Sequence, residues 1–305
     1  MLTLKKELDR DFIVLNLTDI QMGDAEWEEG HAYKKILVHT VTELVNRVKP
    51  GLITLSGDLA WAGQVAAYEA LADFIDSFEI PWTVAWGNHD NQDGPEFINQ
   101  MVESYSKRKY FIYEKGEESL GNGNFVIGIE EDGRIVEGIF IMDTHDRAPY
   151  TDAEGNTSQA WAKMIPEQID WYKQQIHALS EMGCNDTVMI MHIPIYAYRQ
   201  AYDAALRKEV SMVGVQHEGI CSYPAEDGVF DAITELKSTK YVIAGHEHVN
   251  NWMIRYKDVT LIYSLKTGAG GYWEENMNGG TVIQINYNGV SEVRHEDVDS
   301  KSILK

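Results

Sequence analysis

Side chains that can bind metal ions or transfer protons occur in five short groups along this sequence. In chain order, the groups are Asp19-Ile20-Gln21, Gly57-Asp58, Gly87-Asn88-His89-Asp90, the single His192, and Gly245-His246-Glu247-His248. Carboxylate and amide oxygens and imidazole nitrogens bind transition metals, and histidine also exchanges protons near neutral pH. The residue types therefore indicate metal-assisted or acid–base chemistry.

The spacing within two of these groups has a geometric reason. Residues i and i+2 of an extended backbone point to the same side, so Asp19 and Gln21 can aim at one point. His246 and His248 have the same spacing. A glycine directly precedes Asp58, where it permits a tight turn that a Cβ atom would hinder.

Each group taken alone is weak evidence for a site. A single aspartate after a strand, such as Asp19 or Asp58, usually caps a turn or a helix. A lone histidine such as His192 is more often a hydrogen-bonded core residue. The ordered set of five groups in one chain reverses this expectation and favours the metal interpretation.

The elements that must position these groups are short apolar runs, which predict buried strands. The predicted strands are 12–17, 52–55, 82–85, 139–142, 188–191, 241–244 and 261–263, and the predicted helices are 33–48, 68–78 and 166–182. Continuous apolar strands that alternate with helices are typical of α/β folds, in which helices cover the sheets. Most of the five groups directly follow a predicted strand, and sites in such folds gather at the carboxyl ends of strands.

Other segments predict irregular structure. Residues 116–138 are rich in Gly, Glu and Asn and predict a loop with an excursion hairpin, while 144–163 predict a second long irregular segment. The Asn288-Gly289 pair predicts a hairpin turn in a β-rich C-terminal part. The tail from Ser300 onward is expected to fray.

The charge of the chain narrows its possible partners. A net charge of −22 over 305 residues repels nucleic acid backbones and anionic membranes, so we expect neither as a partner. An anionic substrate would need strong positive charge at its site, which a bound metal pair would supply.

Composition also predicts compartment and domain organisation. The chain has only two cysteines, Cys184 and Cys221, so reduced thiols fit better than a disulfide framework. The apolar run 12–17 is too short for a signal peptide, and no run approaches the roughly 20 apolar residues of a membrane span. We therefore expect a cytoplasmic protein with a single domain over residues 1–305.

The five groups resemble the motifs of the calcineurin-like metallophosphoesterase superfamily: D-x-H, G-D, G-N-H-[DE], a lone H, and G-H-x-H, in that order. All five occur between Asp19 and His248, so the resemblance covers most of the chain. Segments 161–173, 245–252 and 266–272 look most similar to the purple-acid-phosphatase-like, non-purple branch. The resemblance implies a four-layer α/β/β/α sandwich, in which helices flank two mixed sheets.

The resemblance also implies a ligand set and a reaction. The first metal would be bound by Asp19, Asp58 and His248, with Gln21 at the usual histidine position, and the second by Asp58, Asn88, His192 and His246. Asp58 would bridge two transition metals, and a shell of nitrogen and oxygen without sulfur suits Mn, Fe or Zn. The implied reaction is hydrolysis of phosphate esters by a metal-bridging hydroxide, while His89 protonates the leaving oxygen.

The sequence departs from the superfamily pattern at two positions. Gln21 replaces a histidine, and a neutral amide is a weaker ligand, so the first metal should bind less tightly. Trp61 stands three residues after Asp58, where purple enzymes carry a metal-bound tyrosine, so no purple colour is expected. Trp61 has no carboxylate that could accept a hydrogen bond from His89 and so orient its ring. Asp90 is a candidate for orienting His89, and a purely structural role for Asp90 is the alternative.

Several alternatives remain open from the sequence. Phosphomonoesters are the favoured substrates and phosphodiesters the alternative, in either a small molecule or a phosphoprotein. A non-catalytic metal- or phosphate-binding scaffold is the rival class, which only Gln21 favours. Two further histidines, His145 and His217, could contact substrate, although a capping or loop role for each is the competing interpretation.

Overall fold

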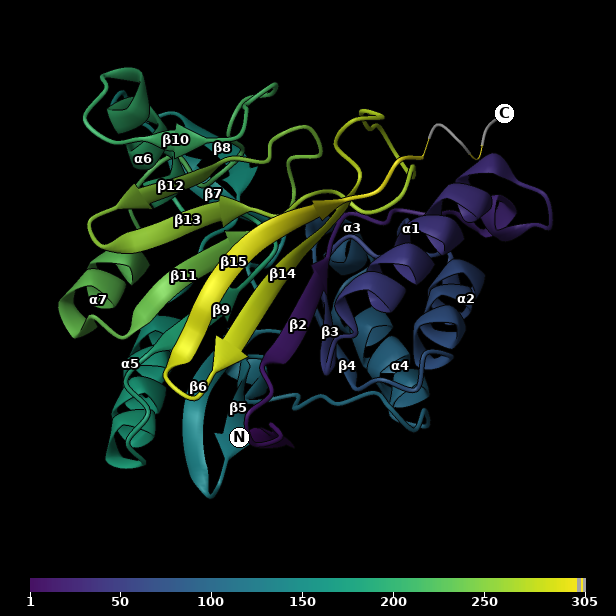
Figure 1. Cartoon of the computed structure of the whole chain (residues 1–305). Helices are drawn as coiled ribbons and strands as arrows, with labels where there is room; N and C mark the ends of the chain where they lie inside the picture. The colour runs from purple at the N-terminus through teal and green to yellow at the C-terminus, as the bar shows by residue number, and fades with distance from the viewer. Residues whose placement is uncertain (301–302, 304–305) are drawn as a thin grey trace.

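The computed structural model describes residues 1–300 and 303 and places the strands in two stacked sheets (Figure 1). The strands are β1 (Leu2–Lys5), β2 (Phe12–Leu17), β3 (Leu52–Ser56), β4 (Trp82–Ala85), β5 (Phe125–Glu131), β6 (Arg134–Ile141), β7 (Arg147–Thr151), β8 (Thr157–Trp161), β9 (Thr187–Ile190), β10 (Met212–Val213), β11 (Thr239–Ala244), β12 (Met253–Tyr256), β13 (Val259–Tyr263), β14 (Gly279–Asn286) and β15 (Gly289–Asp297). The helices are α1 (Ala32–Val48), α2 (Val65–Asp76), α3 (Asn88–Asn91), α4 (Pro95–Tyr105), α5 (Pro166–Glu181), α6 (Ala197–Leu206) and α7 (Val229–Leu236), with the 3-10 turns η1 (Asp24–Trp27) and η2 (Glu118–Leu120).

Both stacked sheets contain parallel and antiparallel pairs. The smaller sheet has the order β15-β14-β2-β3-β4, in which β2, β3 and β4 run parallel and β14 pairs antiparallel with β2 and β15. The larger sheet has the order β1-β5-β6-β9-β11-β13-β12-β10, with parallel pairing from β6 through β9 and β11 to β13. A separate hairpin, β7-β8, lies outside both sheets.

Alternating side chains of the central strands enter two different hydrophobic layers. In β2, Val14 belongs to the layer between the sheets, whereas its neighbour Leu15 packs in the layer beneath α1, α2 and α4. In β9, Val188 faces the other sheet, and Met189 packs in the layer with α5, α6 and α7. Burial on both faces explains why these strands read as continuous apolar runs.

The three hydrophobic layers separate four structural layers. Helices α1, α2 and α4 cover the outer face of the smaller sheet, and α5, α6 and α7 cover the larger sheet (Figure 1). The predicted α/β/β/α sandwich of two mixed sheets is thereby confirmed. None of the helices among the described residues is long and apolar enough to cross a membrane.

Some elements differ from the prediction. Residues 116–138 contain a hairpin as predicted, formed by β5 and most of β6, but it pairs within the larger sheet and is not an excursion from a loop. The prediction of irregular structure over 144–163 is also wrong, since the β7-β8 hairpin occupies it. The Asn288-Gly289 hairpin between β14 and β15 is confirmed. Ser300 is buried rather than frayed, and the rest of the predicted frayed tail, except Ile303, lies outside the described residues.

Candidate metal centre

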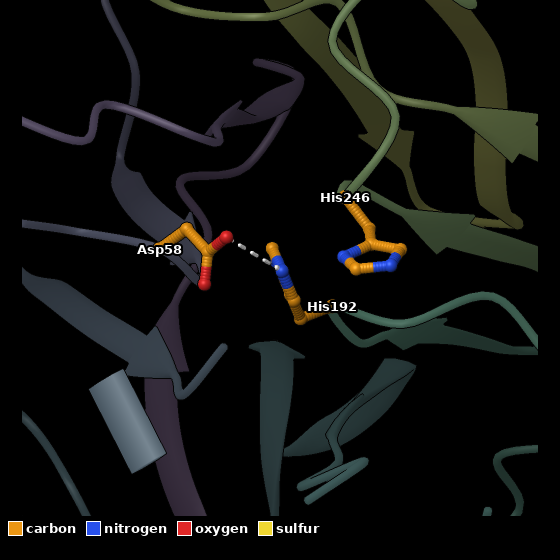
Figure 2. Close-up of side chains that lie close together, drawn as sticks. All are labelled: Asp58, His192 and His246. Atoms are coloured by element: carbon orange, nitrogen blue, oxygen red, sulfur yellow. Dashed lines mark ion pairs between the residues drawn. The ribbon is translucent and has the colours of Figure 1, made fainter. Parts of the chain in front are cut away.

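Three side chains from separate strand ends converge at the carboxyl ends of the central strands. Asp58 follows β3, His192 follows β9, and His246 follows β11, and Figure 2 shows the three side chains gathered at one place. One potential ligand atom from each residue lies within 4.8 Å of the others. The Asp58 carboxylate Oδ2 is 3.2 Å from His192 Nε2. The fold therefore brings together side chains that are far apart in the sequence, since 188 positions separate Asp58 from His246.

Asn88 joins the same cluster through His192. The Asn88 Oδ1 atom lies 3.1 Å from His192 Nε2, while the His192 Nδ1 atom lies 2.9 Å from the Ser56 carbonyl oxygen. Because a carbonyl only accepts, Nδ1 must donate, and a neutral His192 then presents the lone pair of Nε2 to the oxygens of Asp58 and Asn88. A lone pair and two acceptor oxygens that face one another require a proton or a cation between them.

The remaining predicted ligands contact Asp58 or Asp19. His248 Nε2 is 3.4 Å from Asp19 Oδ1, and its Nδ1 donates to the Tyr272 carbonyl at 2.7 Å. Gln21 donates its Nε2 to Asp58 Oδ2 at 3.1 Å, and its Oε1 is buried without a hydrogen-bond partner. A half-turn of the amide would exchange these two atoms. Asp19, Gln21, Asp58 and His248 thus meet as the sequence predicted, although the amide faces Asp58 with its nitrogen.

The charges of the cluster shift the pKa values of its members. Burial opposes ionisation of Asp19, but the hydrogen bond and charge of His248 outweigh burial and lower the pKa of Asp19. Burial likewise opposes ionisation of Asp58, yet His192 lowers the pKa of Asp58. Burial disfavours the charged form of His192, but the Asp58 carboxylate outweighs burial and raises the pKa of His192 to about 10. Burial and the neighbouring His192 instead lower the pKa of His246 to about 3.

The backbone holds several proposed ligands in a conformation that non-glycine residues seldom adopt. The φ angle is 55° at Asp19, 45° at Gln21, 52° at Asp58 and 77° at His246. Left-handed backbone at such residues costs on the order of 1 kcal/mol each and persists only where the surroundings enforce it. At Gly57, which also has a positive φ of 88°, an added Cβ would lie 2.4 Å from His192 Nδ1. Glycine is therefore required for His192 to approach the Asp58 turn.

Asp90 supports the Asp58 turn rather than His89. Its carboxylate accepts from the backbone N–H groups of Asp58 at 2.9 Å, Leu59 at 3.0 Å and Gly87 at 2.7 Å, and from the Tyr68 hydroxyl at 2.7 Å. Burial and the nearby Asp58 charge raise the pKa of Asp90 to about 6. The structural alternative for Asp90 is thus the one that the geometry supports.

His89 lies beside the cluster without joining it. Its backbone N–H donates to Asp58 Oδ1 at 2.8 Å, while its Nε2 stays 3.9 Å from Asp58 Oδ2. The side chain is 25% exposed, and the Trp61 ring packs against it edge-on at 4.8 Å. This placement leaves an imidazole at the rim of the site, where it can reach a bound molecule.

The donor set fits two metal ions. Two buried carboxylates, Asp19 and Asp58, lie next to three histidine rings, so oxygen and nitrogen ligand atoms are concentrated at one place. His246 Nε2 and Gln21 Oε1 are both buried and lack any hydrogen-bond partner, so each retains a lone pair that could bind a metal. Nitrogen and oxygen donors of this kind match the ligand preferences of Mn, Fe and Zn.

Three residues near the site were not predicted as site residues, although they lie in the segments 161–173 and 266–272 that carry the resemblance to the non-purple branch. Lys266 is fully buried and donates its Nζ to the Asp19 carbonyl oxygen, and burial lowers the pKa of Lys266 to about 8. The Trp161 ring lies 4.3 Å from the His246 ring, and Tyr272 stacks on His248 at 4.1 Å. These residues belong to no ligand motif, and only tertiary packing places them here.

The two histidines predicted as substrate contacts have different surroundings. His145 is 3.0 Å from Gln168 Oε1 through its Nε2, and its Nδ1 is 3.5 Å from Asp143 Oδ2. His145 also lines a cavity that adjoins α3. His217 instead forms an exposed pair with Glu274, 3.0 Å away. Neither ring joins the ligand cluster.

The fold and this cluster agree with the family that a comparison of the sequence identifies. Residues 13–250 match the family model of the calcineurin-like phosphoesterases, and the chain belongs to that family. Membership implies a centre with two metal ions.

Relatives and a solved structure agree with this assignment. The chain is 28% identical to "Probable inactive purple acid phosphatase 14" of Arabidopsis thaliana, over 73% of this chain but only 60% of the relative's length. It is 22% identical to "Probable inactive purple acid phosphatase 28" of the same plant, over 90% of this chain and 75% of the relative. The crystal structure of a dimetal phosphatase from Danio rerio superposes with a TM-score of 0.58 at 12% identity, covering 93% of this chain and 98% of that one. This last likeness shows the shared fold.

Proposed function

We propose that this protein hydrolyses phosphate esters at a dinuclear metal centre. The proposed ligands are Asp19, Gln21, Asp58, Asn88, His192, His246 and His248. The observation that carries the proposal is the convergence of Asp58, His192 and His246, in which the buried Nε2 atom of His246 has no hydrogen-bond partner. Manganese, iron and zinc all suit such a donor set.

The residues around the cluster have separate tasks in the proposed reaction. When bound, the metal pair would neutralise phosphate charge and activate a water molecule for in-line attack. Asp58 contacts Gln21 of one proposed ligand set and His192 of the other and would be shared by both sets, while Asp90 holds its backbone in place. His89 would donate a proton to the leaving-group oxygen, because it is close to the ligands but free of the cluster. Trp61 restricts the orientation of the His89 ring by packing against it.

The substrate is proposed from charge and chemistry. Phosphomonoesters are favoured over phosphodiesters, in a small molecule or a phosphoprotein. The net charge of −22 argues against a nucleic acid or an anionic membrane as partner. Two free cysteines agree with a cytoplasmic location, which belongs to the same proposal.

A non-catalytic scaffold is the second candidate function. The word "inactive" in the names of two plant relatives favours it, and so does the Gln21 nitrogen that faces Asp58. The presence of His89 beside a complete second ligand set favours catalysis instead.

Paired measurements of metal content and turnover distinguish the two candidates. Protein loaded with manganese should bind up to two ions per chain and hydrolyse p-nitrophenyl phosphate. Asp58→Asn should lose affinity for both ions and lose activity, whereas Asp203→Asn, an exposed control on α6, should change neither. Two bound ions without turnover on any monoester or diester would support the scaffold. Full dinuclear occupancy in Asp58→Asn would contradict the bridging role.

His89→Asn separates chemistry from binding. The variant should keep both metal ions and lower kcat by roughly 10²- to 10⁴-fold, the usual contribution of a positioned general acid. The loss should be smaller for esters with good leaving groups, since these need less protonation. Loss of metal together with activity would make His89 a ligand, and unchanged turnover would make it structural.

A further inference from the structure

A polar cavity of about 500 Å³ lies next to the helix that carries His89. Its chemically distinctive lining residues are Asn91, Lys115, Glu118, Asn122, Asp146 and Arg147. Pro95 is the one apolar side chain among the described residues that line it. The volume falls within the roughly 300–1,000 Å³ that small-molecule sites occupy.

Both walls of the cavity are fixed to the metal centre. On one wall, Asn91 donates its Nδ2 to the Gly87 carbonyl at 2.9 Å, directly before the proposed ligand Asn88. On the other wall, Arg147 pairs in register with Trp161, whose ring contacts His246 at 4.3 Å. A molecule in the cavity would therefore lie on the His89 side of the site, where the leaving group of a bound ester belongs.

Hydrogen bonds hold the floor of the cavity rigid. Asn122 donates its Nδ2 to Asn91 Oδ1 at 2.9 Å and its backbone N–H to Asp143 Oδ2 at 2.6 Å. The neighbouring His145 is held by Gln168, whose Nε2 donates to the Asp143 carbonyl at 2.7 Å. The cavity is thus organised before any ligand binds, which lowers the entropic cost of recognition.

The cations of the cavity can bind an anion. The Arg147 guanidinium stacks on the Trp161 ring at 3.5 Å, and its Nε is 3.7 Å from Asp146, beyond hydrogen-bonding distance. Stacking fixes the plane of the guanidinium and leaves its N–H groups available to a phosphate, which it can bind through two bonds. Lys115 supplies a second, exposed cation.

The remaining lining selects a hydroxyl-rich molecule. The Glu118 and Asp146 carboxylates accept hydrogen bonds from hydroxyl groups, and the asparagine amides both donate and accept. A nucleobase would be favoured by an extended aromatic or apolar wall for stacking, and a lipid by an extended apolar surface. The described lining offers only one aromatic ring, His145, which is held by Gln168, and one apolar side chain, Pro95.

We propose that this cavity binds a polyhydroxylated leaving group that carries a second phosphate, so that sugar or polyol bisphosphates are the substrate class. The inference rests on the proposed phosphoesterase function. In the proposed complex, one phosphate of the substrate lies at the metal centre, and Arg147 and Lys115 bind the other phosphate. Asp146 and Glu118 accept from the hydroxyl groups between the two.

A matched substrate pair tests the inference. Fructose 1,6-bisphosphate and fructose 1-phosphate differ only in the second phosphate, and p-nitrophenyl phosphate reports activity without a polar leaving group. Manganese-loaded protein should show a kcat/KM at least roughly tenfold higher for the bisphosphate, since a hydrogen-bonded ion pair contributes about this factor. Arg147→Gln should reduce that ratio by roughly tenfold, mainly through KM, and Lys115→Gln should reduce it less. Arg255→Gln, an exposed arginine on β12, should leave the ratio unchanged.

The outcomes separate this inference from the proposed function. Turnover of p-nitrophenyl phosphate with equal kcat/KM for the two sugar phosphates would overturn the inference alone. A higher kcat/KM on a phosphoserine peptide than on the bisphosphate would also overturn it. Absence of turnover on every ester would contradict the proposed function. Calorimetric titration with fructose 6-phosphate, the product that retains the second phosphate, would then test whether the cavity binds that phosphate. Arg147→Gln should weaken the binding of fructose 6-phosphate roughly tenfold. Equal binding by the wild type and Arg147→Gln would refute the site.

Discussion

Gln21 lies at the proposed ligand position that departs from the superfamily motif, and its surroundings explain how the site accommodates it. The Gln21 Nε2 bonds to Asp58, and an added Cβ at Gly271 would lie 2.5 Å from Gln21 Oε1. The fully buried Lys266 donates to the Asp19 carbonyl. A neutral ligand and a nearby ammonium group together reduce the attraction of this half of the site for a cation.

The two metal sites should therefore differ in affinity. After dialysis against a weak chelator, we expect the Asp19 site to empty before the His192 site. Gln21→His should increase retention of the second equivalent of metal, because imidazole is the stronger ligand. Metal analysis against chelator concentration measures both effects. Simultaneous loss of both ions in the wild type, or unchanged retention in Gln21→His, would contradict the expected asymmetry.

Individual residues show how far the sequence could predict the site. The proposed ligands follow strand ends and carry recognisable motifs, so their convergence was predictable from position. The roles of Lys266 and Trp161 were not predictable, because a lysine or a tryptophan outside a motif gains its role only from what packs around it. For the same reason, the sequence could not decide whether Asp90 orients His89 or has a structural role, since the hydrogen-bond partners of Asp90 lie on other elements.

At the scale of elements, the short helix α3 and the turn after β3 act as one unit. The Asp90 carboxylate bonds to three backbone N–H groups, two of which belong to Asp58 and Leu59, and to the hydroxyl of Tyr68 from α2. These bonds counteract the unfavourable backbone angle of Asp58. Asp90 thereby positions the bridging ligand from outside the cluster.

Replacing Asp90 by asparagine tests this support. The amide nitrogen would face backbone donors that need an acceptor, so we expect a loss of about 1–3 kcal/mol in the free energy of unfolding. Metal retention should also weaken, since Asp58 would be less well held. Tyr68→Phe removes only the hydroxyl donor and should have a smaller effect on both quantities. Denaturant unfolding and metal analysis are the measurements, and full stability with full metal retention in Asp90→Asn would exclude the supporting role.

The elements themselves were predictable to different degrees. The strands that carry the ligands are buried on both faces, and the predicted ranges 12–17 and 82–85 coincide with β2 and β4. By contrast, β5 contains a glycine and two glutamates and draws its stability from pairing with β1 and β6. The two strands of the β7-β8 hairpin bury no side chain completely. Such segments become strands through tertiary pairing, which local sequence does not reveal.

At the scale of the whole molecule, a buried carboxyl group lies where a strand of the larger sheet meets a strand of the smaller sheet. Glu137 of β6 is fully buried, and its Oε2 accepts from the backbone N–H of Val290 in β15 at 3.0 Å. Its Oε1 is buried without a hydrogen-bond partner. Burial, and to a lesser extent the charge of Asp186, raise the pKa of Glu137 to about 8. The carboxyl therefore joins the two sheets in its protonated form.

This raised pKa makes stability depend on pH in a defined direction. The unfolded chain ionises Glu137 near its ordinary pKa of 4.5, whereas the folded chain keeps the proton until about pH 8. The folded state binds more protons in this window, so the free energy of unfolding should fall as pH rises from about 4.5 to about 8. The contribution of this group should then level off.

Glu137→Gln isolates the effect from every other titrating group. Glutamine keeps an oxygen that can accept from Val290 and cannot ionise, so the variant should match the wild type near pH 5 and exceed it by a few kcal/mol at pH 8. Urea unfolding at pH 5, 6.5 and 8 measures the difference, and Glu117→Gln, an exposed glutamate, should leave it near zero. Parallel pH profiles for wild type and Glu137→Gln would mean that the folded carboxyl ionises normally. The contact between the sheets would then hold a charged group, and the description of it as a protonated contact would be wrong.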